Sequence, residues 1–142
     1  MFYVDTTVLV AYYCPEPLSE KAEAFITAHA RPAISNLSEL ELFSAISRKI
    51  REGGLDRKDG SRIIAKFLSH LDDLSYAKLP IEPHHYRLAR DWIGQFTTSL
   101  RSLDAIHLAI ASSEGATLIT ADEGLAKSAA SLAVDAVLLS ID

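Results

Sequence analysis

The sequence contains five short strand-like segments, each three or four residues long and centred on apolar residues, with longer helix-like segments between them. Such short, apolar runs are typical of strands that are buried on both faces of a sheet. Because strands and helical segments alternate along the chain, we expect a parallel sheet with helices on both faces. The expected strands are residues 2–4, 32–35, 78–81, 117–120 and 136–139.

Helical segments are expected between these strands. Gly53 and Gly115 are predicted to end two of the helices, and Thr6 or Thr7 is predicted to cap the first. Apolar residues lie almost all round the helix expected at 37–52, so we expect it to be largely buried. The expected helices are residues 8–13, 19–30, 37–52, 56–74, 84–96, 103–114 and 122–132.

The chain has 142 residues, of which 49% are hydrophobic and 23% are charged. This balance is typical of a globular protein and excludes a disordered one. The length suits one domain, and the sequence contains no internal repeat, linker or low-complexity segment. We therefore expect residues 1–142 to form a single domain.

The formal net charge is −5, whereas nucleic-acid-binding domains are usually basic overall. The charge is unevenly distributed, because residues 48–66 contain seven basic and three acidic residues. This stretch is either a solvated helix surface or a flank that contacts phosphates beside an acidic site.

The chain contains one cysteine, Cys14, which excludes an intrachain disulfide and fits a reducing compartment. The first residues lack a basic segment, and the apolar run at 8–14 is too short to span a membrane. We therefore expect a cytoplasmic protein that does not associate with membranes.

Acidic residues occupy similar places in several of the expected strand–helix units. Asp5 ends the first strand, Asp122 follows the strand at 117–120, and Asp104 lies in the first turn of a helix. Glu39 or Glu41 lies in the first turns of another helix. The helix dipole alone favours each such residue, but strand ends and helix starts meet at one edge of a parallel sheet. We therefore expect four carboxylates to converge there.

A cluster of like charges raises its own pKa values unless a cation neutralises it. Oxygen ligands without cysteine favour Mg²⁺ or Mn²⁺ over zinc. Such ions bind phosphate oxygens and activate water for attack. The acidic residues therefore indicate hydrolysis of a phosphodiester bond.

Four segments follow one another along the chain: residues 4–7 (VDTT), 35–45 (SNLSELELFSA), 103–109 (LDAIHLA) and 118–122 (LITAD). Together they resemble the motifs of PIN-domain ribonucleases of the VapC toxin type, and 103–109 is the most specific match. The resemblance implies a three-layer α/β/α sandwich around a mainly parallel sheet of about five strands.

The resemblance and the helical period disagree about the glutamate. The period places Glu39 in register with Phe43 and Ile46, on the apolar face of its helix. The family spacing, counted from Ser35, implies Glu41 instead. We choose Glu41, and Glu39 remains the alternative.

The resemblance implies a role for each residue of the site. The four acidic residues form a catalytic site for Mg²⁺ or Mn²⁺, two threonines orient carboxylates or water, and an arginine contacts phosphate. The implied catalytic residues are Asp5, Glu41, Asp104 and Asp122, with Asp5 and Asp104 as the principal metal ligands, Thr6 and Thr120 as the orienting residues, and Arg48 as the RNA contact.

The resemblance also implies the reaction and the partners. The substrate would be RNA, such as transfer or ribosomal RNA, and cleavage would leave a 5′-phosphate and a 3′-hydroxyl. A cognate VapB-type antitoxin would occupy a groove near the acidic site, and two copies of the chain would form a homodimer.

Two other functions fit parts of the pattern. A haloacid-dehalogenase-type phosphatase also begins with a strand that ends in aspartate, but it needs a second aspartate where this chain has Thr7. A catalytically inactive PIN-like module that binds RNA or protein is the other alternative, and the four intact acidic residues count against it.

Histidines and tyrosines also invite functional interpretations. We expect His107 to be a packed, hydrogen-bonded residue beside the site, and not a ligand or base. His84 and His85 are expected to form a surface pair. Tyr12 and Tyr13 are expected to be core or interface residues, and not platforms for RNA bases.

Overall fold

The computed structural model describes residues 1–29 and 31–141. Its strands form a five-stranded, all-parallel sheet with the order β3-β2-β1-β4-β5. The central strand is therefore the first in the sequence. The strands are β1 (Phe2–Val4), β2 (Ala33–Ser35), β3 (Ala77–Leu79), β4 (Thr117–Thr120) and β5 (Ala136–Leu138).

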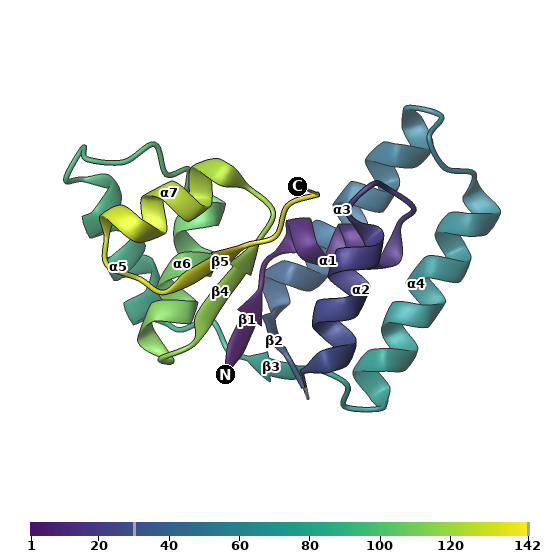
Figure 1. Ribbon diagram of the computed structural model, residues 1–142, viewed down its shortest axis with the longest axis horizontal. Coiled ribbons are helices and arrows are strands. Elements are labelled where there is room, and N and C mark those ends of the chain that lie inside the picture. The colour runs from purple at the N-terminus through teal and green to yellow at the C-terminus, as the bar shows by residue number, and fades with distance from the viewer. Residues whose placement is uncertain (30, 142) are drawn as a thin grey trace.

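Seven helices in the described residues cover the two faces of the sheet. Helices α1 to α4 pack on one face and α5 to α7 on the other, with the sheet between them (Figure 1). This arrangement confirms the predicted α/β/α sandwich. The helices are α1 (Thr6–Tyr13), α2 (Ser19–Ala28), α3 (Asn36–Arg51), α4 (Arg57–Asp72), α5 (Pro83–Ile93), α6 (Ser102–Ser113) and α7 (Glu123–Ser131).

Neighbouring side chains of β1 and β4 lie on opposite faces of the sheet. Val4 packs in the cluster with α1 to α4, whereas the preceding Tyr3 packs in the cluster with α5 to α7. Ile119 and Leu118 divide in the same way on β4. All four residues are fully buried, because side chains alternate along a strand and both faces of this sheet are covered.

The chain changes direction across the sheet between β1 and β4. It builds β2 and β3 on one side of β1, and then returns to place β4 and β5 on the other. Ligands of open parallel sheets bind beyond the carboxyl ends of the strands at such a reversal. Asp5 follows β1 directly and Asp122 lies two residues beyond β4, so both acidic residues lie at this point.

Several expected boundaries differ from the structure. The third strand is 77–79 and not 78–81, because Pro80 lacks the N–H that would continue the ladder. Helix α1 is capped by Asp5, whose Oδ1 accepts from the Val8 amide, and not by Thr6 or Thr7. Helix α2 ends at Ala28, and residue 30, to which it was expected to extend, lies outside the described residues.

Helix α3 is less buried than its composition predicted. Only Ser38, Leu42 and Ile46 are buried among its residues, and Leu40 is 68% exposed. Its fully buried residues form one stripe, spaced four residues apart, and Phe43 and Ile50 are only partly buried against the same core. Glycines end α3 and α6 as predicted, since Gly53 and Gly115 follow them with φ of 81° and 65°.

None of the helices in the described residues is both long and apolar enough to cross a membrane.

The core on the α1–α4 face contains a cluster of aromatic rings. Phe67 of α4 is fully buried and meets Tyr13 edge-on, with ring centroids 5.4 Å apart. Phe67→Ala should lower the free energy of unfolding by about 3–5 kcal/mol, because it opens a cavity. Leu68→Ala, on the neighbouring and 45% exposed side chain, should change it by only about 0.5 kcal/mol. Urea denaturation measures both, and equal losses would contradict the described packing.

Candidate active site

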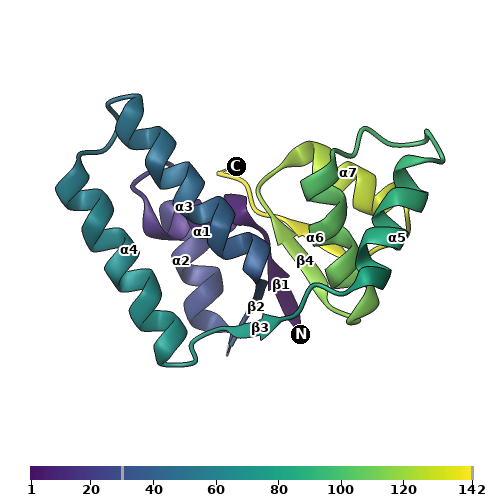
Figure 2. The ribbon, with the colours of Figure 1, turned by 180° about the vertical axis from the view of Figure 1, so that it is seen from behind.

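An acidic cleft of about 740 Å³ lies beyond the carboxyl end of β1. Its walls come from the start of α1, from α3 and from α6, and Figure 2 shows α3 and α6 on either side of β1. Three of the predicted acidic residues line this acidic cleft together: Asp5, Glu41 and Asp104. They are distant in sequence, and only the sheet topology brings them to one place.

Asp5 is 3% exposed and tightly held. Its Oδ1 accepts hydrogen bonds from the Thr7 hydroxyl and the Val8 amide, and its Oδ2 accepts one from the Thr120 hydroxyl. A carboxylate has about four acceptor positions, so one remains for a ligand. Burial raises the pKa of Asp5, and the hydrogen bonds from Thr120 and Thr7 lower it only in part.

Glu41 is held by donors from two other helices. The Thr6 hydroxyl of α1 donates to Oε1 over 2.7 Å, and His107 of α6 also contacts Oε1 through Nε2. Burial raises the pKa of Glu41, but the hydrogen bonds from His107 and Thr6 help to outweigh it, so the net shift is downward. Glu41 is therefore ionised at neutral pH.

Glu39 lies elsewhere. Its carboxylate pairs with Lys78 of β3 over 3.0 Å, and it does not line the acidic cleft. The structure therefore brings Glu41 to Asp5 and Asp104, and the alternative glutamate is part of an ion pair outside the cleft.

Asp104 is in the first turn of α6 and is crowded by other carboxylates. Burial raises its pKa, and the negative charges of Asp122, Asp5 and Glu41 raise it further. The ionised form of Asp104 is therefore disfavoured in the protein alone. A cation beside Asp104 would remove this penalty.

Asp122 lies on the other side of Asp104. It caps α7, since its Oδ1 accepts from the Leu125 amide over 3.1 Å. It lines a second cleft of about 380 Å³, which also contains Asp104. Thr120 connects it to Asp5, because the Thr120 hydroxyl accepts from the Asp122 amide and donates to Asp5. Asp104 is thus shared by the two clefts.

The donors of the acidic cleft fit a magnesium or manganese ion. They are carboxylate and hydroxyl oxygens, the ligands that these hard cations prefer. In residues 1–29 and 31–141, no three Asp, Glu, His or Cys side chains are grouped closely enough to form a metal cage. Mg²⁺ commonly binds through one or two carboxylates, with waters and substrate phosphates completing its shell. Asp5 and Asp104 are suited to that mode.

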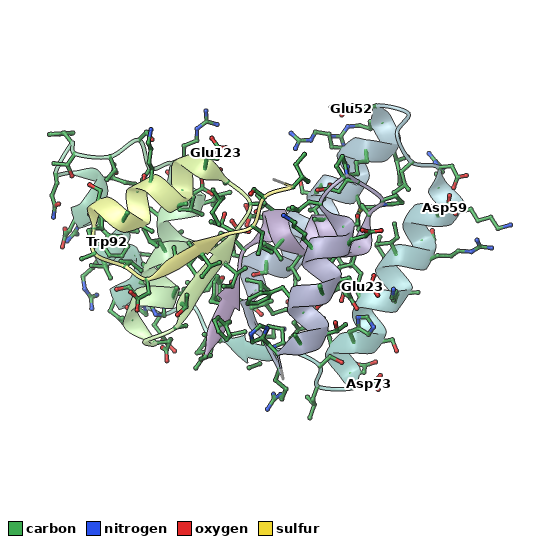
Figure 3. All side chains as sticks on the ribbon, viewed as in Figure 1. Glu23, Glu52, Asp59, Asp73, Trp92 and Glu123 are labelled. Carbon is green, nitrogen blue, oxygen red and sulfur yellow. The ribbon has the colours of Figure 1, made fainter. Side chains whose placement is uncertain are left out.

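Basic residues of the C-terminal half of α3 also line the acidic cleft. Arg48 lies two turns after Glu41 on the same face of α3, with the small Ala45 between them, and all three line the cleft. Lys49 and Arg51 also line the cleft. Acidic residues are present there too: Figure 3 labels Glu52, directly after α3, at the upper edge of the molecule. Basic and acidic residues therefore line the same cleft.

The prediction for His107 is confirmed, but two residues that hold the site through hydrogen bonds were not predicted. His107 is buried and hydrogen-bonded beside the site, as predicted. Its partner Tyr3, whose hydroxyl lies 2.7 Å from Nδ1, was not singled out. A tyrosine inside a short buried strand is the available signal, because its hydroxyl needs a partner there. Thr7, which holds Asp5, was also missed.

Of the other histidine and tyrosine predictions, the one for His84 and His85 is wrong and the one for Tyr13 is confirmed. His84 is exposed, but His85 is fully buried, so the predicted surface pair is wrong. The Glu82 amide donates to the His85 ring, which closes a capping box at the start of α5. Tyr13 is buried, and its hydroxyl contacts Tyr76 over 2.7 Å, which confirms its place in the core.

A family model described as "PIN domain" matches residues 2–130. The chain belongs to the PIN domain family. Comparison with curated protein sequences found no match.

Solved structures resemble this PIN domain over most of its length. FitAcB from Neisseria gonorrhoeae has a TM-score of 0.74 at 20% identity, covering 96% of both chains. VapC20 from Mycobacterium tuberculosis, described as a sarcin-ricin loop cleaving toxin, has a TM-score of 0.71 at 14% identity, covering 89% and 94%. A toxin–antitoxin complex from Klebsiella pneumoniae has a TM-score of 0.64 at 18% identity, covering 89% and 91%. At these identities the likeness shows the fold.

The crowding of carboxylates around Asp104 predicts an effect on stability. Without metal, Asp104→Asn should raise the melting temperature by about 2–4 °C, because it removes a charge that its neighbours repel. Added Mn²⁺ should stabilise the wild type more than the variant. Differential scanning calorimetry in EDTA and then in Mn²⁺ measures both effects.

A matched control is Asp91→Asn, since Asp91 is exposed on α5 beside Arg90 and should leave both values unchanged. A variant at Asp104 that melts below the wild type in EDTA would contradict the described crowding.

Proposed function

We propose that this PIN domain is a metal-dependent endoribonuclease and the toxin of a VapBC-type toxin–antitoxin pair. The observation that supports it is the convergence of Asp5, Glu41 and Asp104 on one cleft, with Asp122 beside them. A cleft lined by both acidic and basic residues suits a phosphodiester substrate and a divalent cation together.

Each residue has a part in this proposal. Asp5 and Asp104 hold Mg²⁺ or Mn²⁺, and Glu41 and Asp122 complete the acidic surroundings. The bound ion supplies a water of lowered pKa and neutralises charge that develops on the phosphate. Thr120 holds the Asp5 carboxylate in place from β4.

Other side chains position the substrate and the acidic residues. Thr6 fixes Glu41 through the hydrogen bond to Oε1. Arg48, which lines the cleft, contacts a substrate phosphate. Among the described residues Arg48 forms no ion pair, so its guanidinium is available for this contact.

The partners follow from the same proposal. The substrate is RNA, with transfer or ribosomal RNA as the expected targets, and the products carry a 5′-phosphate and a 3′-hydroxyl. A VapB-type antitoxin restrains the activity, and the toxin is a homodimer in the cytoplasm. The similar folds of a toxin that cleaves the sarcin-ricin loop and of a toxin–antitoxin complex support this assignment. Residues 1–142 act as one domain.

Asp5→Asn and Asp104→Asn should each abolish cleavage of total RNA in Mg²⁺ or Mn²⁺, because each removes a charged metal ligand. Both variants should keep the wild-type circular dichroism spectrum, since asparagine matches aspartate in size. Gel electrophoresis of RNA incubated with each purified protein gives the measurement. Full activity in either variant would refute the assignment of these ligands.

Glu41 and Glu39 provide a matched comparison within one helix. Glu41→Gln should lower the rate of RNA cleavage by about 10²-fold or more, whereas Glu39→Gln should stay within about twofold of the wild type. Glu39 pairs with Lys78 outside the cleft, so its loss removes only an exposed ion pair. A larger loss of rate in Glu39→Gln than in Glu41→Gln would reverse the assignment.

A further inference from the structure

A continuous series of hydrogen bonds runs from the sheet to the acidic cleft. The Ser35 hydroxyl at the end of β2 lies 2.8 Å from the Tyr3 hydroxyl on β1. The Tyr3 hydroxyl lies 2.7 Å from His107 Nδ1, and His107 Nε2 contacts Glu41 Oε1. Ser35, Tyr3 and His107 are buried, and only the last member, Glu41, lines the cleft along with the edge of His107.

Each hydrogen bond between Tyr3, His107 and Glu41 has a defined donor and acceptor. The Thr6 hydroxyl and His107 Nε2 both contact Oε1 of Glu41, and a carboxylate oxygen only accepts hydrogen bonds. His107 must therefore donate to it from Nε2. In the neutral imidazole Nδ1 is then an acceptor, and the Tyr3 hydroxyl is its donor. The Tyr3 hydroxyl supplies this proton and accepts in turn from the Ser35 hydroxyl, 2.8 Å away.

The two hydrogen bonds to Glu41 act on one oxygen. His107 and Thr6 both donate to Oε1, and they do so from helices α6 and α1, on opposite faces of the sheet. The glutamate side chain has several rotatable bonds, and the neighbouring carboxylates repel it. Two fixed donors keep the Glu41 carboxylate in the cleft despite this repulsion. Both donors bind Oε1, so Oε2 takes no part in these two hydrogen bonds.

We propose that Tyr3 and His107 are positioning residues: Tyr3 holds His107 as the Nε2–H tautomer, and His107 fixes the Glu41 carboxylate for RNA cleavage. The catalytic consequence rests on the proposed function, whereas the tautomer does not depend on it. An alternative role, in which these bonds only satisfy buried polar groups, would leave catalysis unaffected by any change that preserves the fold.

The tautomer is tested by NMR on protein labelled with ¹⁵N-histidine. Long-range ¹H–¹⁵N spectra distinguish a protonated Nε2 from a protonated Nδ1, and the signals that disappear in His107→Gln identify His107. We expect Nε2–H in the wild type and a mixture of tautomers in Tyr3→Phe. An Nδ1–H tautomer, an imidazolium at neutral pH, or a Tyr3→Phe spectrum identical to the wild type would overturn the inference.

The positioning role is tested by steady-state cleavage of RNA. Tyr3→Phe and His107→Ala should each lower kcat by about 10–100-fold, as is typical for residues that orient a catalytic group, with KM within about twofold. His107→Gln still offers an N–H to Glu41 and should recover part of the loss. Wild-type kcat in Tyr3→Phe, or no recovery in His107→Gln, would contradict the role.

Tyr13→Phe is the matched control. Tyr13 is also buried, and its hydroxyl lies 2.6 Å from His70 Nδ1, outside the acidic cleft. This variant removes an equivalent buried hydroxyl and should keep the wild-type kcat; an equal loss of kcat in Tyr13→Phe would overturn the positioning role. If the wild type cleaves no RNA, the proposed function and its catalytic consequence fail together, and the NMR spectra still decide the tautomer.

Discussion

The buried carboxylate of Asp5 is the constraint on which the rest of the site depends. It ends the central strand and accepts hydrogen bonds from Thr7 of α1 and Thr120 of β4. These bonds join the ends of β1 and β4 at the point where the chain reverses its direction across the sheet. The same carboxylate caps α1. One side chain therefore fixes the start of the first helix, the edge of the sheet and one wall of the cleft.

Carboxylates in the same cleft have opposite electrostatic environments. His107 and Thr6 stabilise the charge on Glu41, and its pKa is lowered. Asp104 is partly buried and lies near other negative charges, and both effects raise its pKa. A cation would therefore lower the free energy of Asp104 more than that of Glu41. This difference agrees with the assignment of Asp104, and not Glu41, as a principal metal ligand.

The sequence predicted the features that follow from periodicity and chain order. Apolar strands and intervening helices were sufficient for the parallel sheet, and the positions of Asp5 and Asp104 within them were sufficient for the acidic edge. The helical period alone favoured Glu39, because it reports which face of a helix is apolar and not which face meets a neighbouring element. Family spacing selected Glu41, and the structure places that residue in the cleft.

Features that depend on contacts between distant segments could not be predicted. Tyr3 and His107 are 104 residues apart, and they meet because α6 packs over the side of β1 from which Tyr3 projects. His85 resembled a surface residue because a proline and a second histidine precede it, yet it is buried, with its Nε2 4.0 Å from Glu114 at the end of α6. In both cases tertiary packing, and not local pattern, decides the environment.

Mapping of new RNA ends after induced expression in bacterial cells tests the central claim most directly. Wild-type protein and the Asp104→Asn variant would be expressed separately, and 5′-phosphate ends would be captured and sequenced. Metal-dependent cleavage at the acidic cleft predicts new 5′-phosphate ends at a small number of sites with the wild type and none with the variant. An absence of new ends, ends that carry a 5′-hydroxyl, or the same ends with the variant would contradict it.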